Sequence, residues 1–165
     1  MLIDIAEFGF SFLILISVWM GYTNIMSVLP LESGTVVGLN LVLLFLVSIE
    51  PYLFYLNIIF DLSDHALLLD SASRLYALDM TGLMLILALF TYELAREERG
   101  LVAADLIAHY RRVRDSLFVF AALFLVTVMP IFWNIKIQDL PLRFYFWLIP
   151  LVLSFAFRVS GRFQK

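Results

Sequence analysis

The chain contains no cysteine, and its first residues contain no basic side chain. Without cysteine there can be no disulfide framework and no thiolate metal site. Residues 1–7 include Asp4 and Glu7 but neither Lys nor Arg, whereas a signal peptide needs a basic first region. We therefore expect the first apolar run to be a permanent membrane span.

Charged residues are also scarce, at 15% of the 165 residues, against 63% hydrophobic residues and a mean hydropathy of +0.98. Soluble domains are about half apolar, so a chain of this length could not hide this much apolar surface from water. The formal net charge is −3, and there is no basic patch of the kind that binds nucleic acid. The composition predicts an integral membrane protein whose main surroundings are the lipid bilayer.

Five apolar runs have roughly the 20 residues that an α-helix needs to cross about 30 Å of hydrocarbon. The sequence therefore predicts an all-α fold: one integral membrane helical bundle, residues 1–165, with multiple passes through the cell membrane. The expected spans are residues 8–29, 36–60, 75–94, 117–135 and 140–159.

The connections between these spans differ in charge, which predicts an orientation. Residues 61–74 carry three Asp and one Arg, whereas residues 95–116 carry five Arg, and the last residues add Arg158, Arg162 and Lys165. Basic residues favour the cytoplasmic side, so we expect the C-terminus inside and, after five crossings, the N-terminus outside. The first span has no neighbouring basic residues that would place the N-terminus outside. A helix preceding it would put the N-terminus in the cytoplasm and remove this difficulty.

The connection between the third and fourth spans allows two interpretations. Apolar residues recur in it at helical spacing, with charged residues between them. It could be an interfacial helix near anionic headgroups, or a cytoplasmic extension of the flanking helices, which we favour. The apolar positions are Val102, Leu106, Tyr110 and Val113.

No catalytic pattern is present, so we expect neither an enzyme nor a cofactor or metal site. His65 and His109 are predicted on opposite sides of the membrane, and there is no Ser-His-Asp set and no glycine-rich phosphate loop. Asp79 and Glu93 are expected near opposite ends of the third span, where headgroups can solvate them.

Glu50 is the most costly polar residue, because it lies well inside the second span beside Pro51. A carboxylate at that depth costs about 2.5–3.5 kcal/mol on insertion scales. It could be a cation site or proton-sensitive group, or a neutral, hydrogen-bonded packing residue at the proline. We favour the neutral form, because desolvation opposes ionisation and no basic residue lies at matching depth.

Short motifs in four spans follow one another as in the transmembrane protein 175 family of potassium channels, found in bacteria, archaea and lysosomes. The chain resembles helices two to six of the six-helix repeat of that family. The motifs are Ser11-Phe12-Leu13 with Trp19 and Tyr22, Asn40-Leu41-Val42-Leu43-Leu44-Phe45, Ser48-Ile49-Glu50-Pro51, Leu75-Tyr76-Ala77-Leu78-Asp79 and Ile149-Pro150-Leu151.

This resemblance implies a homotetramer that conducts potassium ions, with the first helix of the repeat lining the pore. That helix has no counterpart here, so we expect it to be encoded upstream, removed or supplied by another chain. Trp19, Asn40 and Ser48 match positions that would hold it by hydrogen bonds. Tyr22 replaces the usual His of the family, and Glu50 replaces an apolar residue.

Three functions therefore remain open. The first is a subunit, or an N-terminally incomplete form, of a potassium-permeable channel, in which this chain provides the scaffold around the pore. The second is a non-conducting membrane scaffold or accessory subunit that binds other transmembrane helices. The third, a small proton-coupled transporter using Glu50, is less favoured because the five spans show no inverted repeat.

Overall fold

The computed structural model describes residues 2–29, 34–62, 66–137, 140–150 and 152, and this part of the chain is mostly helical, with short turns and two very short strands. Residues 142–150 are helical as well. The elements are α1 Leu2–Met26, α2 Gly34–Leu62, α3 Ala66–Leu94, the 3₁₀ turn η1 Glu97–Arg99, α4 Ala104–Val126, α5 Ile131–Asn134, β1 Lys136–Ile137 and β2 Leu140–Pro141.

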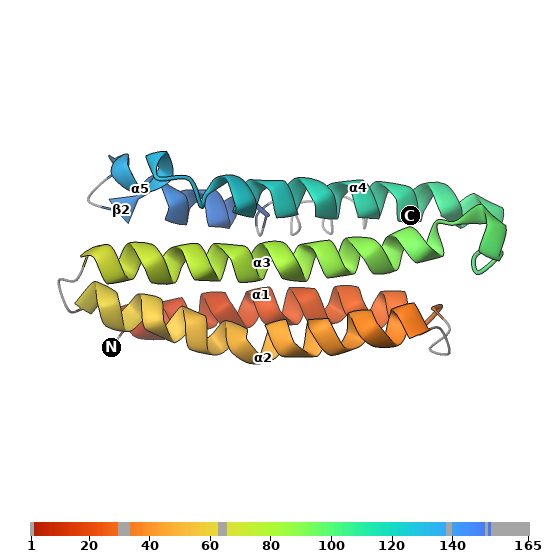
Figure 1. Ribbon diagram of the computed structural model, residues 1–165, viewed down its shortest axis with the longest axis horizontal. Coiled ribbons are helices and arrows are strands. Elements are labelled where there is room, and N and C mark those ends of the chain that lie inside the picture. The colour runs from red at the N-terminus through yellow and green to blue at the C-terminus, as the bar shows by residue number, and fades with distance from the viewer. Residues whose placement is uncertain (1, 30–33, 63–65, 138–139, 151, 153–165) are drawn as a thin grey trace.

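The long helices lie side by side and alternate in direction, so the bundle has two distinct ends (Figure 1). The end of α2, the start of α3 and the β1–β2 hairpin lie at one end, which we call the hairpin end. The end of α1, the start of α2 and the turn between α3 and α4 lie at the other end, which we call the turn end. Successive long helices among the described residues thus run in opposite directions, as expected for successive membrane spans.

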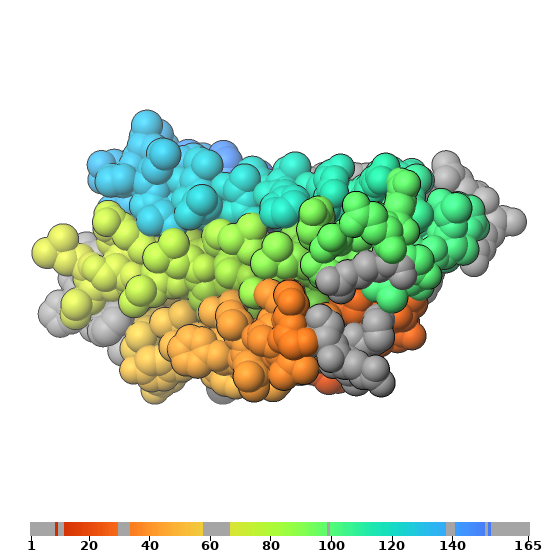
Figure 2. Space-filling model, turned by 45° about the vertical axis from the view of Figure 1, so that its right-hand side comes forward, coloured from red at the N-terminus to blue at the C-terminus, as the bar shows by residue number. Residues whose placement is uncertain are grey.

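Helix α3 forms the centre of the bundle and packs against α1, α2 and α4. Figure 2 shows it lying between α4 and α2, with one face at the surface. Tyr76, Met80, Leu83 and Phe90 of α3 are completely buried. A Cβ atom at Gly82 would lie 3.0 Å from Leu46 Cδ1, so this glycine lets α2 approach α3 closely.

The long helices expose many large apolar side chains as well as burying others. On α2 the exposed fractions of Leu41, Leu44 and Phe45 are 62–64%. Several polar and charged side chains lie inside the bundle. The buried ones are Glu50, Asn57, Ser73, Asp79, Thr81, Thr91, Glu93, Thr127 and Arg143.

Two described segments, Gly34–Asn57 and Leu67–Leu94, are long and apolar enough to cross a membrane, judged by length and composition. A shorter apolar stretch covers Phe12–Met26. The predicted span 36–60 corresponds closely to α2, whereas α1 begins before residue 8 and ends at Met26. The residues after 150, apart from 152, lie outside the described part, so the full span 140–159 stays a prediction.

Two predicted spans have the wrong boundaries. The third helix begins at Ala66 rather than at residue 75. The aspartates of residues 61–74 suggested a loop, but Asp70 pairs with Arg74 one helical turn later, and this pair stabilises a helix. The fourth helix ends at Val126 rather than residue 135. Beyond it, Pro130, the short α5 and the β1–β2 hairpin turn the chain back.

The amphipathic segment before the fourth span is part of α4 itself, which runs without a break from Ala104 to Val126. The interpretation as a helical extension is therefore confirmed for α4 but not for α3, which ends at Leu94, and the segment does not form a separate helix. Gly100, with φ of 57°, ends the η1 turn in a left-handed conformation that an ordinary residue adopts only at a cost.

Candidate functional site

A groove of about 410 Å³ opens between α1 and α2 on the outer surface of the bundle. Its walls are almost entirely apolar, but three hydrogen-bonding side chains, Trp19, Tyr22 and Asn40, are among them. The lining residues are Phe12, Leu15, Ile16, Val18, Trp19, Tyr22, Asn40, Leu43, Leu44 and Val47.

Trp19 and Asn40 lie at matching depth although they come from different helices. Each is about 10 Å along its helix from the turn end, at about 1.5 Å per residue. Trp19 is 62% exposed and contacts Tyr22, with ring centroids 5.8 Å apart. Neither the indole N–H nor the Asn40 amide makes a hydrogen bond with a described residue, so both remain available to an external partner.

Ser48, the third residue that the resemblance singled out, has a different environment. Its hydroxyl donates to the Leu44 carbonyl of its own helix at 2.6 Å, and it does not line the groove. The structure therefore brings together Trp19 and Asn40 but not Ser48.

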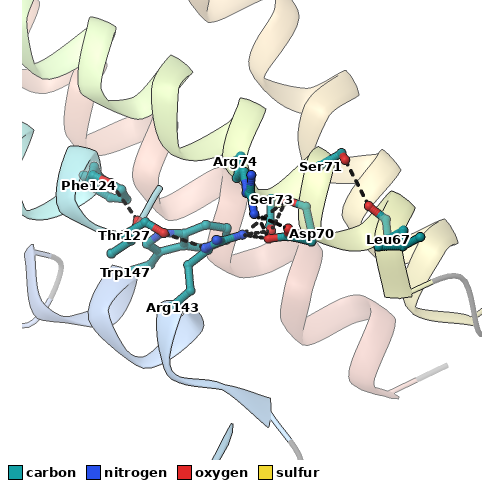
Figure 3. Close-up of polar contacts among 9 residues, drawn as sticks. All are labelled: Leu67, Asp70, Ser71, Ser73, Arg74, Phe124, Thr127, Arg143 and Trp147. Carbon is teal, nitrogen blue, oxygen red and sulfur yellow. Dashed lines mark hydrogen bonds and ion pairs between the residues drawn. The ribbon is translucent and has the colours of Figure 1, made fainter. Parts of the chain in front are cut away.

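A second polar site, centred on Arg143, ties the helical segment 142–150 to α3 and α4 near the hairpin end (Figure 3). The Arg143 side chain is completely buried. Its Nε donates to the Thr127 carbonyl at 2.7 Å, and its Nη1 donates to Asp70 Oδ1 at 2.9 Å. Nη1 also hydrogen-bonds to the Ser73 hydroxyl. One guanidinium thus joins three elements far apart in the sequence.

Neighbouring groups complete this Arg143 site. Arg74 donates to the two carboxylate oxygens of Asp70, so that carboxylate has two basic partners. The Trp147 indole N–H donates to the Thr127 hydroxyl at 3.1 Å, and the Trp133 ring lies 5.5 Å from the Arg143 guanidinium carbon.

The sequence analysis missed the Arg143 site because it placed Asp70 in the connection 61–74 and assigned no role to Arg143. A signal was present nonetheless. Arg143 falls inside the apolar run 140–159, and an arginine in a span needs a partner. Its partner Asp70 follows a connection predicted to lie on the same side of the membrane.

Glu50 is completely buried, and it interacts electrostatically with Tyr76 and Asp79 of α3. Tyr76 is itself enclosed by two rings, with centroid distances of 5.7 Å to Phe54 and 4.7 Å to Trp147. The expectation that Asp79 lies near a helix end is wrong. Helix α3 begins at Ala66, so Asp79 lies about 20 Å inside it, at about 1.5 Å per residue, and is only 5% exposed.

The turn end carries exposed ion pairs. Arg111 of α4 contacts Glu97 at 2.6 Å, and Arg96 contacts Glu98 at 3.2 Å and Glu93 at 3.9 Å. The hydrogen bond to Glu98 raises the pKa of the Arg96 guanidinium, which stays charged. Exposed pairs of this kind contribute little stability.

No group of three or more His, Cys, Asp or Glu side chains that could hold a metal ion occurs among the described residues. His109 is exposed on α4, and the predicted position of His65 falls outside the described part.

Comparison with known proteins gives no match: no family model, no curated protein and no solved structure is similar to this chain.

Proposed function

We propose that this protein is an integral membrane subunit that holds a transmembrane helix of another polypeptide in the groove between α1 and α2. We further propose, from the sequence resemblance, that the resulting assembly conducts potassium ions and that this chain forms its scaffold. The observation that carries the proposal is the presence of Trp19 and Asn40, without hydrogen-bond partners, in one apolar groove.

The chemistry of the groove favours a polypeptide helix over a lipid acyl chain. An acyl chain would fill the apolar walls but would leave the Asn40 amide and the Trp19 indole unsatisfied, and unsatisfied polar groups are costly in lipid. A helix with a polar side chain about 10 Å from the turn end would satisfy both, at about 1.5 Å per residue. The expected occupant is therefore an apolar helix with a hydrogen-bonding residue at that depth.

The outward apolar faces and inward polar residues support a membrane location. Side chains such as Leu41 and Phe45 would be unfavourable in water but suit lipid, and ionisable residues inside a membrane bundle normally face protein. We propose five crossings of the cell membrane, with the hairpin end outside and the turn end inside, as the arginine-rich α4 start favours.

Photo-cross-linking tests the occupant of the groove. A photoreactive phenylalanine analogue replaces Leu44, which lines the groove, or Phe45, which is equally exposed but does not line it. In native membranes we expect a defined polypeptide adduct from position 44 and lipid adducts alone from position 45. Equal polypeptide adducts from the two positions, or lipid adducts alone from both, would contradict the proposal.

Substitution of the groove amide provides a matched comparison. Asn40→Leu removes the amide and is expected to weaken the position-44 adduct about threefold, since one interhelical hydrogen bond contributes about 0.6 kcal/mol. Asn24→Leu, at an exposed asparagine outside the groove, should leave the adduct unchanged. An adduct insensitive to Asn40→Leu would show that the polar pair does not select the partner.

Both the channel and the non-conducting scaffold would hold a partner helix in the groove, so a measurement of ion flux is needed to distinguish them. The cross-linkable assembly, reconstituted in liposomes, should carry potassium flux, whereas the purified chain alone should carry none. Its described helices provide no ring of carbonyls of the kind that selects ions. A stable assembly without flux would support the scaffold, and selective flux from the chain alone would overturn the assignment of the pore to the partner.

A further inference from the structure

Glu50 of α2 and Asp79 of α3 meet at the same depth of the bundle. Each lies about 20 Å along its helix from the hairpin end, at about 1.5 Å per residue. Glu50 interacts electrostatically with Asp79 and with Tyr76, one turn before Asp79 on α3. None of the three side chains is more than 5% exposed. Two carboxyl groups and a phenol therefore share one buried location.

The protein does not supply hydrogen bonds to the Asp79 carboxylate. Both of its oxygens are buried and accept no hydrogen bond from the described residues. The Tyr76 hydroxyl is buried beside Glu50 and interacts with it. A buried carboxylate without a donor is unfavourable, and uptake of a proton removes its charge and supplies an O–H donor.

No basic side chain compensates the two acids. Helices α1 and α2 contain no Lys, Arg or His, and neither do residues 75–95, 116–135 and 144–157. The elements around the site contribute neutral groups: Phe54 and Trp147 enclose Tyr76. On the hairpin side, the described basic groups of the neighbouring elements are Arg143, which is held by Asp70, Ser73 and Thr127, and Arg74, which is paired with Asp70.

We propose that Glu50 and Asp79 form a single proton-binding site. One carboxylate takes up a proton to become a carboxylic acid, whose O–H then donates to the other carboxylate or to the Tyr76 oxygen. Two ionised carboxylates close together in a medium of low dielectric are strongly unfavourable, so the first proton is held more firmly than the second.

A proton fits this site better than a metal ion does. Calcium requires six to eight oxygen ligands, and three side chains here supply fewer. A metal cation arriving from the hairpin end would also meet the buried guanidinium of Arg143, and like charges repel strongly away from water. A proton needs no coordination shell. The hydroxyls of Ser73 and Tyr76, spaced three residues apart on α3, lie between Arg143 and the carboxyls.

An infrared pH titration of the full chain in lipid nanodiscs tests this site through the carbonyl band of protonated carboxyl groups. The wild-type protein should show that band at neutral pH and lose it in a distinct step on further alkalinisation. Glu50→Gln and Asp79→Asn should each move this step to lower pH, because the remaining carboxyl stays buried but loses the repulsion of the second charge. The controls Glu97→Gln and Asp115→Asn, at exposed ion-paired carboxylates, should retain it.

Three results would overturn the proposal. The first is the absence of a protonated-carboxyl band in the wild-type protein at neutral pH. The second is a step that keeps the wild-type midpoint in Glu50→Gln or in Asp79→Asn, which would mean independent carboxyls. The third is loss of the band when potassium, sodium or calcium replaces a bulky organic cation at constant ionic strength, which would assign a metal site.

A milder variant covers the case in which a carboxyl substitution prevents folding. Tyr76→Phe keeps the ring contacts with Phe54 and Trp147 and removes the hydroxyl alone. The alkaline step should persist in this variant at a shifted midpoint. An unshifted midpoint would contradict the participation of Tyr76 in the site.

Discussion

Arg143→Met is expected to destabilise the bundle by about 3 kcal/mol, near the lower end of the range for breaking a buried ion pair by removing one partner. The substitution removes the donors to Thr127, Asp70 and Ser73, so acceptors on three buried or partly buried residues lose a partner. Asp70 keeps Arg74, which limits the loss. Unfolding in mixed micelles, followed by circular dichroism, measures the free-energy change.

Two further variants show whether geometry or charge matters at this position. Arg143→Lys keeps the charge but cannot reach Thr127 and Asp70 at once, so we expect an intermediate loss of about 1–2 kcal/mol. Arg114→Met, which removes an exposed pair with Asp115, should cost less than about 1 kcal/mol. If Arg143→Met costs no more than Arg114→Met, the Arg143 site does not hold the helices together.

Phe90→Ala is expected to destabilise the bundle by about 3 kcal/mol, at the lower end of the range for truncating a buried phenylalanine. The Phe90 ring is completely buried in α3 and contacts the Tyr22 ring of α1 edge-on, with a centroid distance of 6.1 Å. The lower end applies because, for helices already in lipid, packing contacts rather than exclusion of water drive association.

Phe45→Ala is the matched comparison, since Phe45 is 64% exposed on α2. We expect it to change the unfolding free energy by less than about 0.5 kcal/mol, as is usual for surface substitutions. Equal effects of the two truncations would mean that the outward face of α2 is packed against protein, and the apolar exterior would then need another explanation.

The sequence predicted the presence of the helices that consist of long apolar runs. It predicted the wrong helix boundary where a local ion pair or a reversal of the chain determines that boundary. Helix α2 is almost as predicted, because its interior is mostly apolar and Glu50 is its only charged residue before Asp61. The start of α3 was missed because its aspartates resemble a loop, while the Asp70–Arg74 pair stabilises a helical turn. The end of α4 was missed because residues 127–135 are apolar although the chain turns back there.

The candidate sites divide in the same way. The cost of a carboxyl group in an apolar run singled out Glu50 from the sequence alone, but its neighbours could not be identified before α3 was known to begin at Ala66. Trp19 and Asn40 were singled out by the resemblance, and their shared groove follows from the antiparallel packing of α1 and α2. Arg143 was overlooked because its contacts span more than seventy residues of sequence.

Cysteine labelling tests most directly whether this bundle crosses a membrane. The chain has no cysteine, so Ser71→Cys and Asn134→Cys at the hairpin end, and Ala103→Cys at the turn end, would each give a signal without background. An impermeant maleimide added to intact cells should label the first two, and Ala103→Cys should react only after the membrane is opened. Labelling of all three positions in intact cells, or of none before opening, would contradict a bundle that spans the membrane in this orientation.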